Sequence, residues 1–336
     1  MRKLASIQII ENISPIPDAN VIRVANVLGW KVVIKEGQFN IGDRCVFVEI
    51  DAVFPPKPEF AEFLKRSNRL KTIRLRGQVS QGVCLPMSIL PPGDYNVGDD
   101  VTAILGITKY EPPIPACLAG EVKGAFPSCI PKTDEPRAQV SQDLLNKYQG
   151  QKFYCTEKLD GSSTTYYLKD EQFGVCSRNL EMKYTENNTL WKLANYYEIE
   201  NKLRKLKFNV AIQGECIGEG IQKNVYKLRG QKFYIFNIFH IDEHRYLNLS
   251  EIQEALLTMN HNAVIPLELV PLINVIELPH SVDELVQLSL GASALNKEAL
   301  REGLVFRLYE KEIWDADLGR VSFKAINPEY LLKYGE

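Results

Sequence analysis

A lysine and an aspartate stand two residues apart in the stretch Glu157–Ser162. The flanking residues 151–156 and 163–169 are typical of β-strands, and Asp160-Gly161 is a typical tight-turn pair between them. A lysine at the end of a strand can act as an amine nucleophile, and a nearby carboxylate can help to hold a cation. An ordinary hairpin with an idle lysine would look the same, so the partners of Lys158 decide its role.

Further residues whose side chains could take part in catalysis or binding follow downstream, in strand patterns or in turns. Arg178 ends one strand pattern, and Glu215 stands in another that runs into a glycine-rich turn. Phe236 lies within an aromatic strand pattern, Glu302 in an acidic turn, and Lys324 in the last strand pattern. Each signal is weak alone, but their order along the chain is informative.

The composition is that of an ordinary soluble protein, with 45% hydrophobic and 24% charged residues in a chain of 336. The net charge of −2 excludes a globally basic nucleic-acid binder but leaves room for a local basic patch. The seven cysteines are scattered and form no C-x-x-C pair, so neither a disulfide framework nor a zinc ribbon is indicated. We therefore expect an intracellular, cytoplasmic protein with no membrane-spanning segment.

Residues 1–105 contain short strand patterns separated by frequent turns. The patterns lie at 22–27, 30–34, 44–50, 71–75 and 83–85. About five short strands in roughly 100 residues are typical of an OB-fold β-barrel, and a small sandwich is the alternative. The N-terminal domain is therefore predicted to be an OB-like barrel.

Six prolines punctuate residues 106–137, so this segment cannot form one regular element. We interpret residues 106–150 as a proline-rich linker that ends in a short helix at 141–148. From 151 to 336, many strand patterns mix with a few helical ones. This mixture predicts an α+β domain with mostly antiparallel sheets.

The helical patterns of the second domain lie at 189–206, 250–259 and 281–287. Ser250 and Ser281 are expected to begin the last two helices, because a glutamate follows each of them within one turn.

Six cations gather within twelve residues of the N-terminal domain, with no acid between them: Lys65, Arg66, Arg69, Lys71, Arg74 and Arg76. A solvated surface is the commoner explanation for such a charge run. The cluster would also suit a phosphate backbone, so the barrel is a candidate nucleic-acid-binding platform.

The ordered set of residues resembles the motifs of the covalent nucleotidyltransferase superfamily. It is most similar to the ATP-dependent RNA ligases of the Deinococcus and Naegleria type, which carry an OB domain ahead of the catalytic domain. Lys158-Leu159-Asp160-Gly161-Ser162 resembles motif I, Ser177-Arg178-Asn179 motif Ia, Glu215 motif III, Phe233–Ile238 motif IIIa, Glu302-Gly303 motif IV and Phe323-Lys324 motif V. The linker from Phe126 to Arg137 also resembles the segment that precedes motif I in those ligases.

The resemblance implies an OB domain followed by an ATP-grasp-like nucleotidyltransferase domain, and an enzyme that joins 3′-hydroxyl and 5′-phosphate ends of nicked RNA or of an RNA-containing duplex. The implied roles are a Lys158 nucleophile that takes AMP from ATP, a Mg²⁺ or Mn²⁺ site at Asp160, Glu215 and Glu302, phosphate contacts at Arg178 and Lys324, and an adenine stack on Phe236. Glu215 is alternatively a ribose contact. A monomer without a membrane partner is expected.

Two positions depart from the family pattern. Many members have Lys-x-Lys at motif V, whereas this chain has Ser322-Phe323-Lys324, so Arg320 or Lys311 is a candidate replacement cation. Motif IIIa often has an aspartate where this chain has Asn237.

Two other functions remain open from the sequence. A DNA ligase or a GTP-using capping enzyme belongs to the same superfamily, but those proteins carry their OB domain after motif V, and only twelve residues follow Lys324 here. A non-catalytic RNA-binding protein with a decayed catalytic domain is the second alternative.

Overall fold

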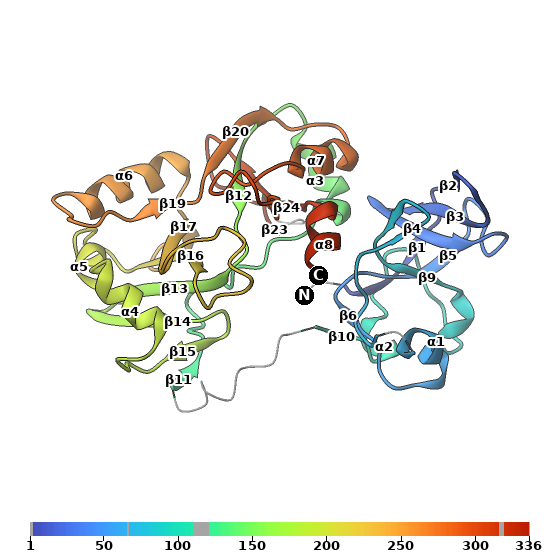
Figure 1. Cartoon of the computed structure of the whole chain (residues 1–336), viewed down its shortest axis with the longest axis horizontal. Helices are drawn as coiled ribbons and strands as arrows, with labels where there is room; N and C mark the ends of the chain where they lie inside the picture. Colours follow the sequence, from blue (N-terminus) through green and yellow to red (C-terminus); the bar gives the residue numbers. More distant parts are fainter. Residues whose placement is uncertain (1–2, 66, 111–120, 316–318, 336) are drawn as a thin grey trace.

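The computed structural model describes residues 3–65, 67–110, 121–315 and 319–335. In Figure 1 the N-terminal strands β1–β9 lie on one side of the molecule, and the largest sheet with helices α4–α6 lies on the other. A smaller sheet and the C-terminal helix lie between these two parts. In the described ranges, no helix is both long enough and apolar enough to cross a membrane.

The N-terminal part consists of short strands in small antiparallel sheets, as the turn-rich sequence predicts. Its two three-stranded sheets have the orders β1-β5-β9 and β2-β3-β4. Buried aliphatic and aromatic side chains, including Val46, Phe47 and Trp30, fill the cores between them. The elements are β1 (Ala5–Ile9), β2 (Asn12–Ile16), β3 (Ala19–Val27), β4 (Trp30–Lys35), β5 (Arg44–Val48), β6 (Ala52–Val53), α1 (Ala61–Leu64), β7 (Ile73–Leu75), β8 (Gln78–Ser80), β9 (Val83–Leu85), α2 (Thr102–Leu105) and β10 (Thr108–Lys109).

The largest sheet has eight strands in the order β11-β15-β14-β13-β16-β17-β18, with β19 paired in parallel to β17. Its strands are β11 (Val122–Ala125), β13 (Ser162–Lys169), β14 (Gln172–Cys176), β15 (Leu180–Met182), β16 (Val210–Gly218), β17 (Gln231–His240), β18 (Arg245–Tyr246) and β19 (Glu268–Leu269). Helices α4 (Thr189–Tyr196), α5 (Ile199–Arg204) and α6 (Leu249–Asn260) cover one face of this sheet and share its core. The other face is left for the site.

A second sheet of four strands has the order β20-β12-β21-β24. Its strands are β12 (Lys152–Lys158), β20 (Leu272–Glu277), β21 (Gly303–Leu308) and β24 (Ser322–Ile326), and β22 (Trp314–Asp315) pairs with β23 (Gly319–Arg320) beside it. Helices α3 (Gln142–Tyr148) and α7 (Val282–Ser289) pack on this sheet, and α8 (Pro328–Tyr334) ends the chain. The second part is therefore α+β with mostly antiparallel sheets, as predicted.

Three local predictions were wrong in instructive ways. Strands β12 and β13 do not form a hairpin, because β12 pairs with β20 and β21 while β13 pairs with β14 and β16. The expected helix at 189–206 is divided into α4 and α5 by Glu198, whose φ of +50° is not helical. Helix α6 begins after Asn248, which forms the capping box with Glu251, so Ser250 is not its cap.

Other predictions were correct. Ser281 caps α7 by accepting a hydrogen bond from the Glu284 amide, and α3 coincides with the short helix expected before motif I. The central part of the predicted linker, 111–120, lies outside the described residues, and the domain boundaries at 105 and 150 stay predictions.

The linker and the C-terminal helix contact the N-terminal part directly. Arg137 lies 3.1 Å from Asp51 of the N-terminal part, and its guanidinium lies 5.8 Å above the Trp30 ring. The Gly29 amide donates to the Gln139 carbonyl oxygen. These contacts place the end of the linker against the N-terminal sheets, while Arg137 forms a parallel bridge with Lys324 of β24.

Candidate active site

The predicted catalytic residues meet where the two sheets of the second part face each other. Lys158 is the last residue of β12 and stands opposite Gly303 of β21, so it lies beside Glu302. Glu215 comes from the middle of β16, opposite Ser163 of β13. The chain crosses from one sheet to the other between Lys158 and Ser162, which explains why motif I contributes residues to both walls.

Gly161 allows this crossing. A Cβ atom at Gly161 would lie 2.2 Å from the Cys216 carbonyl oxygen of β16, which is far inside van der Waals contact. The loop can approach β16 so closely only because residue 161 has no side chain. The approach brings Asp160 and Glu215 to the same wall of the site.

Lys158 is the centre of an acidic environment. Its Nζ lies 2.5 Å from Glu302 Oε1, and Glu302 is largely buried. Burial lowers the pKa of the Lys158 amine, but the carboxylates of Glu302, Glu215 and Asp160 outweigh burial and raise the pKa above its ordinary value. Lys158 is therefore an ammonium until positive charge reaches these carboxylates.

Two tyrosines hold Asp160 in place. The Tyr330 hydroxyl, from α8, donates to Asp160 Oδ2 at 2.5 Å, and the Tyr330 side chain is fully buried. The Asp160 amide donates to the Tyr226 hydroxyl at 2.6 Å. The orientation of this carboxylate thus depends on a helix that lies outside all of the motifs.

Glu215 has a carboxyl group with a raised pKa. Burial raises its pKa first of all, Glu302 and Asp160 raise it further, and Lys158 and Arg178 only partly offset them, so that the pKa is about 8. Such crowding of carboxylates suits a divalent cation. Among the described residues, however, no three His, Cys, Asp or Glu side chains are grouped closely enough to hold a metal ion.

The two predicted phosphate-contacting cations converge on one carboxylate, Asp134 of the linker. Asp134 lies 3.5 Å from Lys324 Nζ and 3.9 Å from Arg178 Nη2, and its other near cation is Lys109 Nζ at 2.6 Å. Burial raises the pKa of Asp134, but Lys324, Lys109 and Arg178 outweigh it and hold the pKa well below its usual range. A phosphate placed here would meet the same three cations.

Phe236 lies on β17 and faces the motif I side of the sheet. It is half-buried and packs against a cluster that includes Leu159, Tyr226 and Tyr234. Its ring therefore borders the loop that follows Lys158, as an adenine contact would require.

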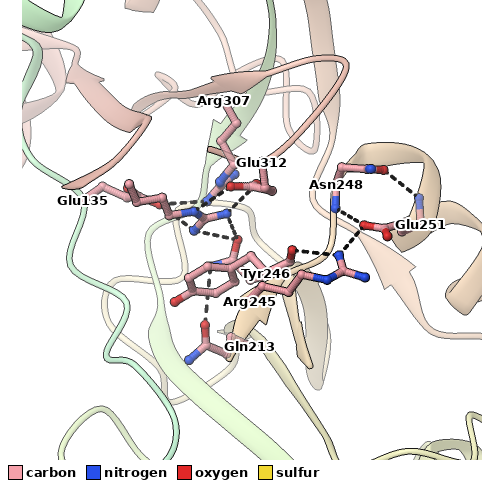
Figure 2. Close-up of polar contacts among 10 residues, drawn as sticks. Glu135, Gln213, Arg245, Tyr246, Asn248, Glu251, Arg307 and Glu312 are labelled. Carbon is pink, nitrogen blue, oxygen red and sulfur yellow. Dashed lines mark hydrogen bonds and ion pairs between the residues drawn. The ribbon is translucent and has the colours of Figure 1, made fainter. Parts of the chain in front are cut away.

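Ser322, the position of the missing motif V lysine, pairs with a strand residue of a buried ionic network, which includes Glu135, Arg307 and Glu312 (Figure 2). Ser322 is fully buried, and its strand partner Arg307 donates to Glu135 Oε1 at 3.1 Å. Arg320 bonds both oxygens of Glu312, at 2.7 and 3.1 Å. Burial lowers the pKa of Arg320, but Glu135 and Glu312 outweigh it and raise the pKa.

Asn237 belongs to the same network. Its Oδ1 accepts from both terminal nitrogens of Arg320 at 3.2 Å, and Arg320 lies 3.6 Å above the Tyr246 ring. Asn237 thus serves as a neutral acceptor where relatives often have an aspartate. Protein acceptors hold the Arg320 guanidinium, whereas Lys311 is exposed to solvent.

Arg320→Ala is expected to lower the free energy of unfolding by about 3–5 kcal/mol, because Glu312 would remain buried without its cation and Glu135 would keep only its ion pair with Arg307. The side chains of Arg320, Glu135 and Glu312 are only 11%, 16% and 13% exposed. Arg204→Ala is the matched control: that side chain is 37% exposed beside Glu200, and its loss should leave the free energy of unfolding nearly unchanged. Urea unfolding followed by tryptophan fluorescence measures both, and equal costs would contradict the network's importance.

Three members of the predicted basic cluster make contacts within the chain. Arg69 lies 2.8 Å from Asp51, Lys71 donates to the Gly335 carbonyl oxygen at 2.7 Å, and Arg74 pairs with Glu329. Lys65 and Arg76 are exposed, and Arg66 lies outside the described residues. The nucleic-acid role of this cluster stays a prediction.

Comparison with known proteins identifies the family. A model of the RNA ligase family matches residues 151–326, and an OB-fold domain model matches residues 4–87. The structure of Naegleria gruberi RNA ligase with pyrophosphate is 43% identical, covers 98% of each chain and superposes with a TM-score of 0.90. The chain belongs to the RNA ligase family. This membership confirms the resemblance, the OB fold and the predicted enzyme class.

Two further structures of the same Naegleria protein match this RNA ligase family member equally well. A glutamate-to-alanine variant with ATP and manganese is 43% identical, covers 100% of each chain and has a TM-score of 0.91. A lysine-to-methionine variant with AMP and manganese is 43% identical, covers 98% of each chain and also has a TM-score of 0.91. A comparison with curated proteins found no match.

Several residues of this ligase family member escaped the sequence reasoning. Asp134 lies in the linker segment that resembles the one ahead of motif I. Its partners are 25 to 190 residues away, so no local pattern indicates its role. Tyr330 follows motif V without a pattern of its own. Glu157, which had no assigned role, is buried and accepts a hydrogen bond from the Ala294 amide at 2.7 Å, so it anchors the loop before motif IV.

Proposed function

We propose that this chain is an ATP-dependent RNA ligase that repairs nicked RNA by joining a 3′-hydroxyl to a 5′-phosphate. One observation carries the proposal: the Lys158 amine lies 2.5 Å from Glu302, between two sheets, in a chain 43% identical to an RNA ligase over 98% of both lengths. Some structures of that relative contain ATP, AMP or pyrophosphate, and those with ATP or AMP also contain manganese.

The chemistry proceeds in three displacements. The neutral Lys158 amine attacks the α-phosphorus of ATP, the bond to pyrophosphate breaks, and AMP becomes linked to the lysine. An oxygen of the RNA 5′-phosphate then attacks the same phosphorus and releases the lysine. Finally the 3′-hydroxyl attacks the 5′-phosphate, AMP departs with the electron pair, and the phosphodiester is complete.

The residues around Lys158 have different roles in these displacements. Arg178 and Lys324 neutralise the α-phosphate as charge develops on it, in place of the Asp134 carboxylate that they face in this structure. Phe236 stacks on the adenine from the β17 side of the site. Glu302 holds the Lys158 amine at the strand end and is its nearest carboxylate.

Asp160, Glu215 and Glu302 fit a Mg²⁺ or Mn²⁺ ion, because they are hard oxygen donors, and burial together with the neighbouring carboxylates raises the pKa of Glu215 to about 8. A divalent ion there supplies positive charge that lowers the pKa of Lys158 and so favours the neutral amine. Since the carboxylates do not form a close three-acid cluster in the described residues, we infer that they hold the ion partly through its water ligands.

Nick sealing tests the proposal. A duplex with one RNA nick should be sealed when the nick carries a 5′-phosphate, ATP and Mg²⁺ or Mn²⁺ are present, and should not be sealed when it carries a 5′-hydroxyl. Parallel reactions with GTP, and with DNA on the 3′-hydroxyl side, separate the capping-enzyme and DNA-ligase alternatives. RNA binding without any sealing would instead support the non-catalytic alternative.

Tyr330→Phe is expected to weaken Mn²⁺ binding about 10- to 100-fold, because it removes only the hydroxyl that orients Asp160. Tyr334→Phe on the same helix is the control, since its hydroxyl makes no hydrogen bond in the described part of the chain. Calorimetric titration with Mn²⁺ in the presence of a non-hydrolysable ATP analogue measures the affinity. Identical affinities for the two variants would contradict the role of Tyr330.

We also propose that the enzyme acts as a cytoplasmic monomer. The scattered, odd number of cysteines supports a reducing setting. Light scattering at the concentrations used for sealing tests the oligomeric state, and a dimer mass would contradict it.

A further inference from the structure

A cationic hollow lies away from the reacting lysine, between α4 and the segment that leads into β17. It encloses about 470 Å³. The residues that line it are Lys192, Leu193, Tyr196, Tyr197, Arg229, Gly230, Gln231 and Lys232. None of the motifs includes these residues, and no acid is among them.

Its three cations have no protein partner in the described part of the chain. Within the described residues, the side chains of Lys192, Arg229 and Lys232 make no ion pair or hydrogen bond. Glu219, from the same loop, accepts a hydrogen bond from the Gly230 amide but does not line the hollow. Three like charges around one hollow repel each other, and a bound polyanion would relieve this repulsion.

The contrast with the N-terminal basic cluster is informative. There, Arg69, Lys71 and Arg74 are bonded to Asp51, Gly335 and Glu329 of the same chain, as described above. A ligand would have to break those contacts before it could use the three cations. A ligand could bind Lys192, Arg229 and Lys232 without breaking any such contact within the described residues.

Two tyrosines give the hollow an aromatic wall. Tyr196 is 55% exposed, and its ring packs edge-to-face against Tyr197 with centroids 5.0 Å apart and an interplanar angle of 85°. An exposed ring held by a second ring suits stacking with an unpaired or terminal base. Cations beside an aromatic surface are the combination by which proteins bind single nucleic-acid strands.

The hollow is connected to the reacting site through one loop, which runs from β16 to β17. Tyr226 of this loop accepts the hydrogen bond from the Asp160 amide, and Gln222 donates to the Gly161 carbonyl oxygen at 3.1 Å. Arg229 follows Tyr226 by three residues. The loop that contacts motif I therefore also supplies Arg229 and Gly230 to the hollow.

We propose that this hollow binds the sugar-phosphate backbone of the RNA strand beside the break, with Arg229, Lys232 and Lys192 on phosphates and Tyr196 under a base. The proposal rests on the proposed function and adds a docking surface to it. A free nucleotide shares this phosphate and base chemistry, so the test has to distinguish ATP from RNA at the hollow.

The test combines Arg229→Gln with Lys232→Gln in one variant. The control pair, Lys35→Gln with Lys207→Gln, removes the same charge from exposed lysines that do not line the hollow. The affinity for a fluorescent nicked RNA duplex is measured as a function of KCl concentration. The slope of log K against log salt should fall by about 2 in the test variant and stay unchanged in the control.

A second readout separates this proposal from the proposed function. Lys158 labelling by ATP needs no RNA, so its rate should be unchanged in the test variant. A wild-type salt slope with normal labelling would overturn the docking surface and leave the ligase proposal intact. Slower labelling would mean that the hollow serves ATP, which also overturns it, whereas absent labelling in the wild type would contradict the ligase proposal itself.

The single variant Lys192→Gln guards against misfolding of the double variant. It should lower the salt slope by about 1, because one phosphate contact is lost. An unchanged slope in a variant whose melting temperature equals that of the wild type would overturn the assignment.

Discussion

Lys158→Ala is expected to abolish covalent labelling of the protein by ATP that carries radioactivity in its α-phosphate. The Lys158 amine is the proposed nucleophile that forms the bond to phosphorus, and alanine leaves the strand pairing with Gly303 intact. The labelling rate should fall by roughly 10⁴-fold or more, as for other lost nucleophiles. Denaturing gel electrophoresis after incubation with ATP and Mn²⁺ gives the readout.

Lys152→Ala is the matched control for this experiment. Lys152 begins the same strand, is exposed, and lies six residues before Lys158. The control should label at the wild-type rate. If the Lys158→Ala variant is labelled as well as the control, the covalent site lies elsewhere.

Lys324→Ala is expected to slow Lys158 labelling by about 10²- to 10³-fold, the usual cost of removing one group that stabilises a developing negative charge. Its side chain is only 15% exposed, and its amine faces Asp134, on which Arg178 also converges. Because the family's second lysine is replaced here by Ser322, the remaining lysine should carry more of the charge. Single-turnover labelling with saturating ATP measures the rate.

Lys311→Ala serves as the control and also tests how the missing lysine is replaced. Lys311 is exposed, next to Glu312 of the buried network. If Lys311→Ala leaves the rate of Lys158 labelling unchanged, Lys311 does not substitute for the absent motif V lysine. A loss equal to that of Lys324→Ala would show that it does, and would contradict the assignment of the phosphate charge mainly to Lys324.

Local signals in the sequence were sufficient for much of the fold. Alternating apolar residues and turn residues located strands such as β3, β4 and β17, because these patterns depend only on neighbours along the chain. The capping serine of α7 was found for the same reason. The residues expected around Lys158 were also brought together, since Glu302 and Glu215 both contribute to the charge around its amine.

Features that depend on distant pairing were not predictable. An Asp-Gly turn between two strands normally indicates a hairpin, yet β12 and β13 join different sheets here because each has better partners elsewhere in the chain. Tyr330 reaches Asp160 across 170 residues of sequence. The engagement of Arg69, Lys71 and Arg74 within the chain likewise depends on residues that approach only in the folded protein.

Mass spectrometry of the wild-type protein after incubation with ATP and Mn²⁺ tests the central claim most directly. The account predicts that the intact mass increases by one AMP group, and that digestion places this group on the peptide that contains Lys158. Addition of pyrophosphate should remove it, because the first displacement is reversible. An unmodified protein, a GMP adduct formed from GTP in preference to AMP, or AMP on a different lysine would contradict the account.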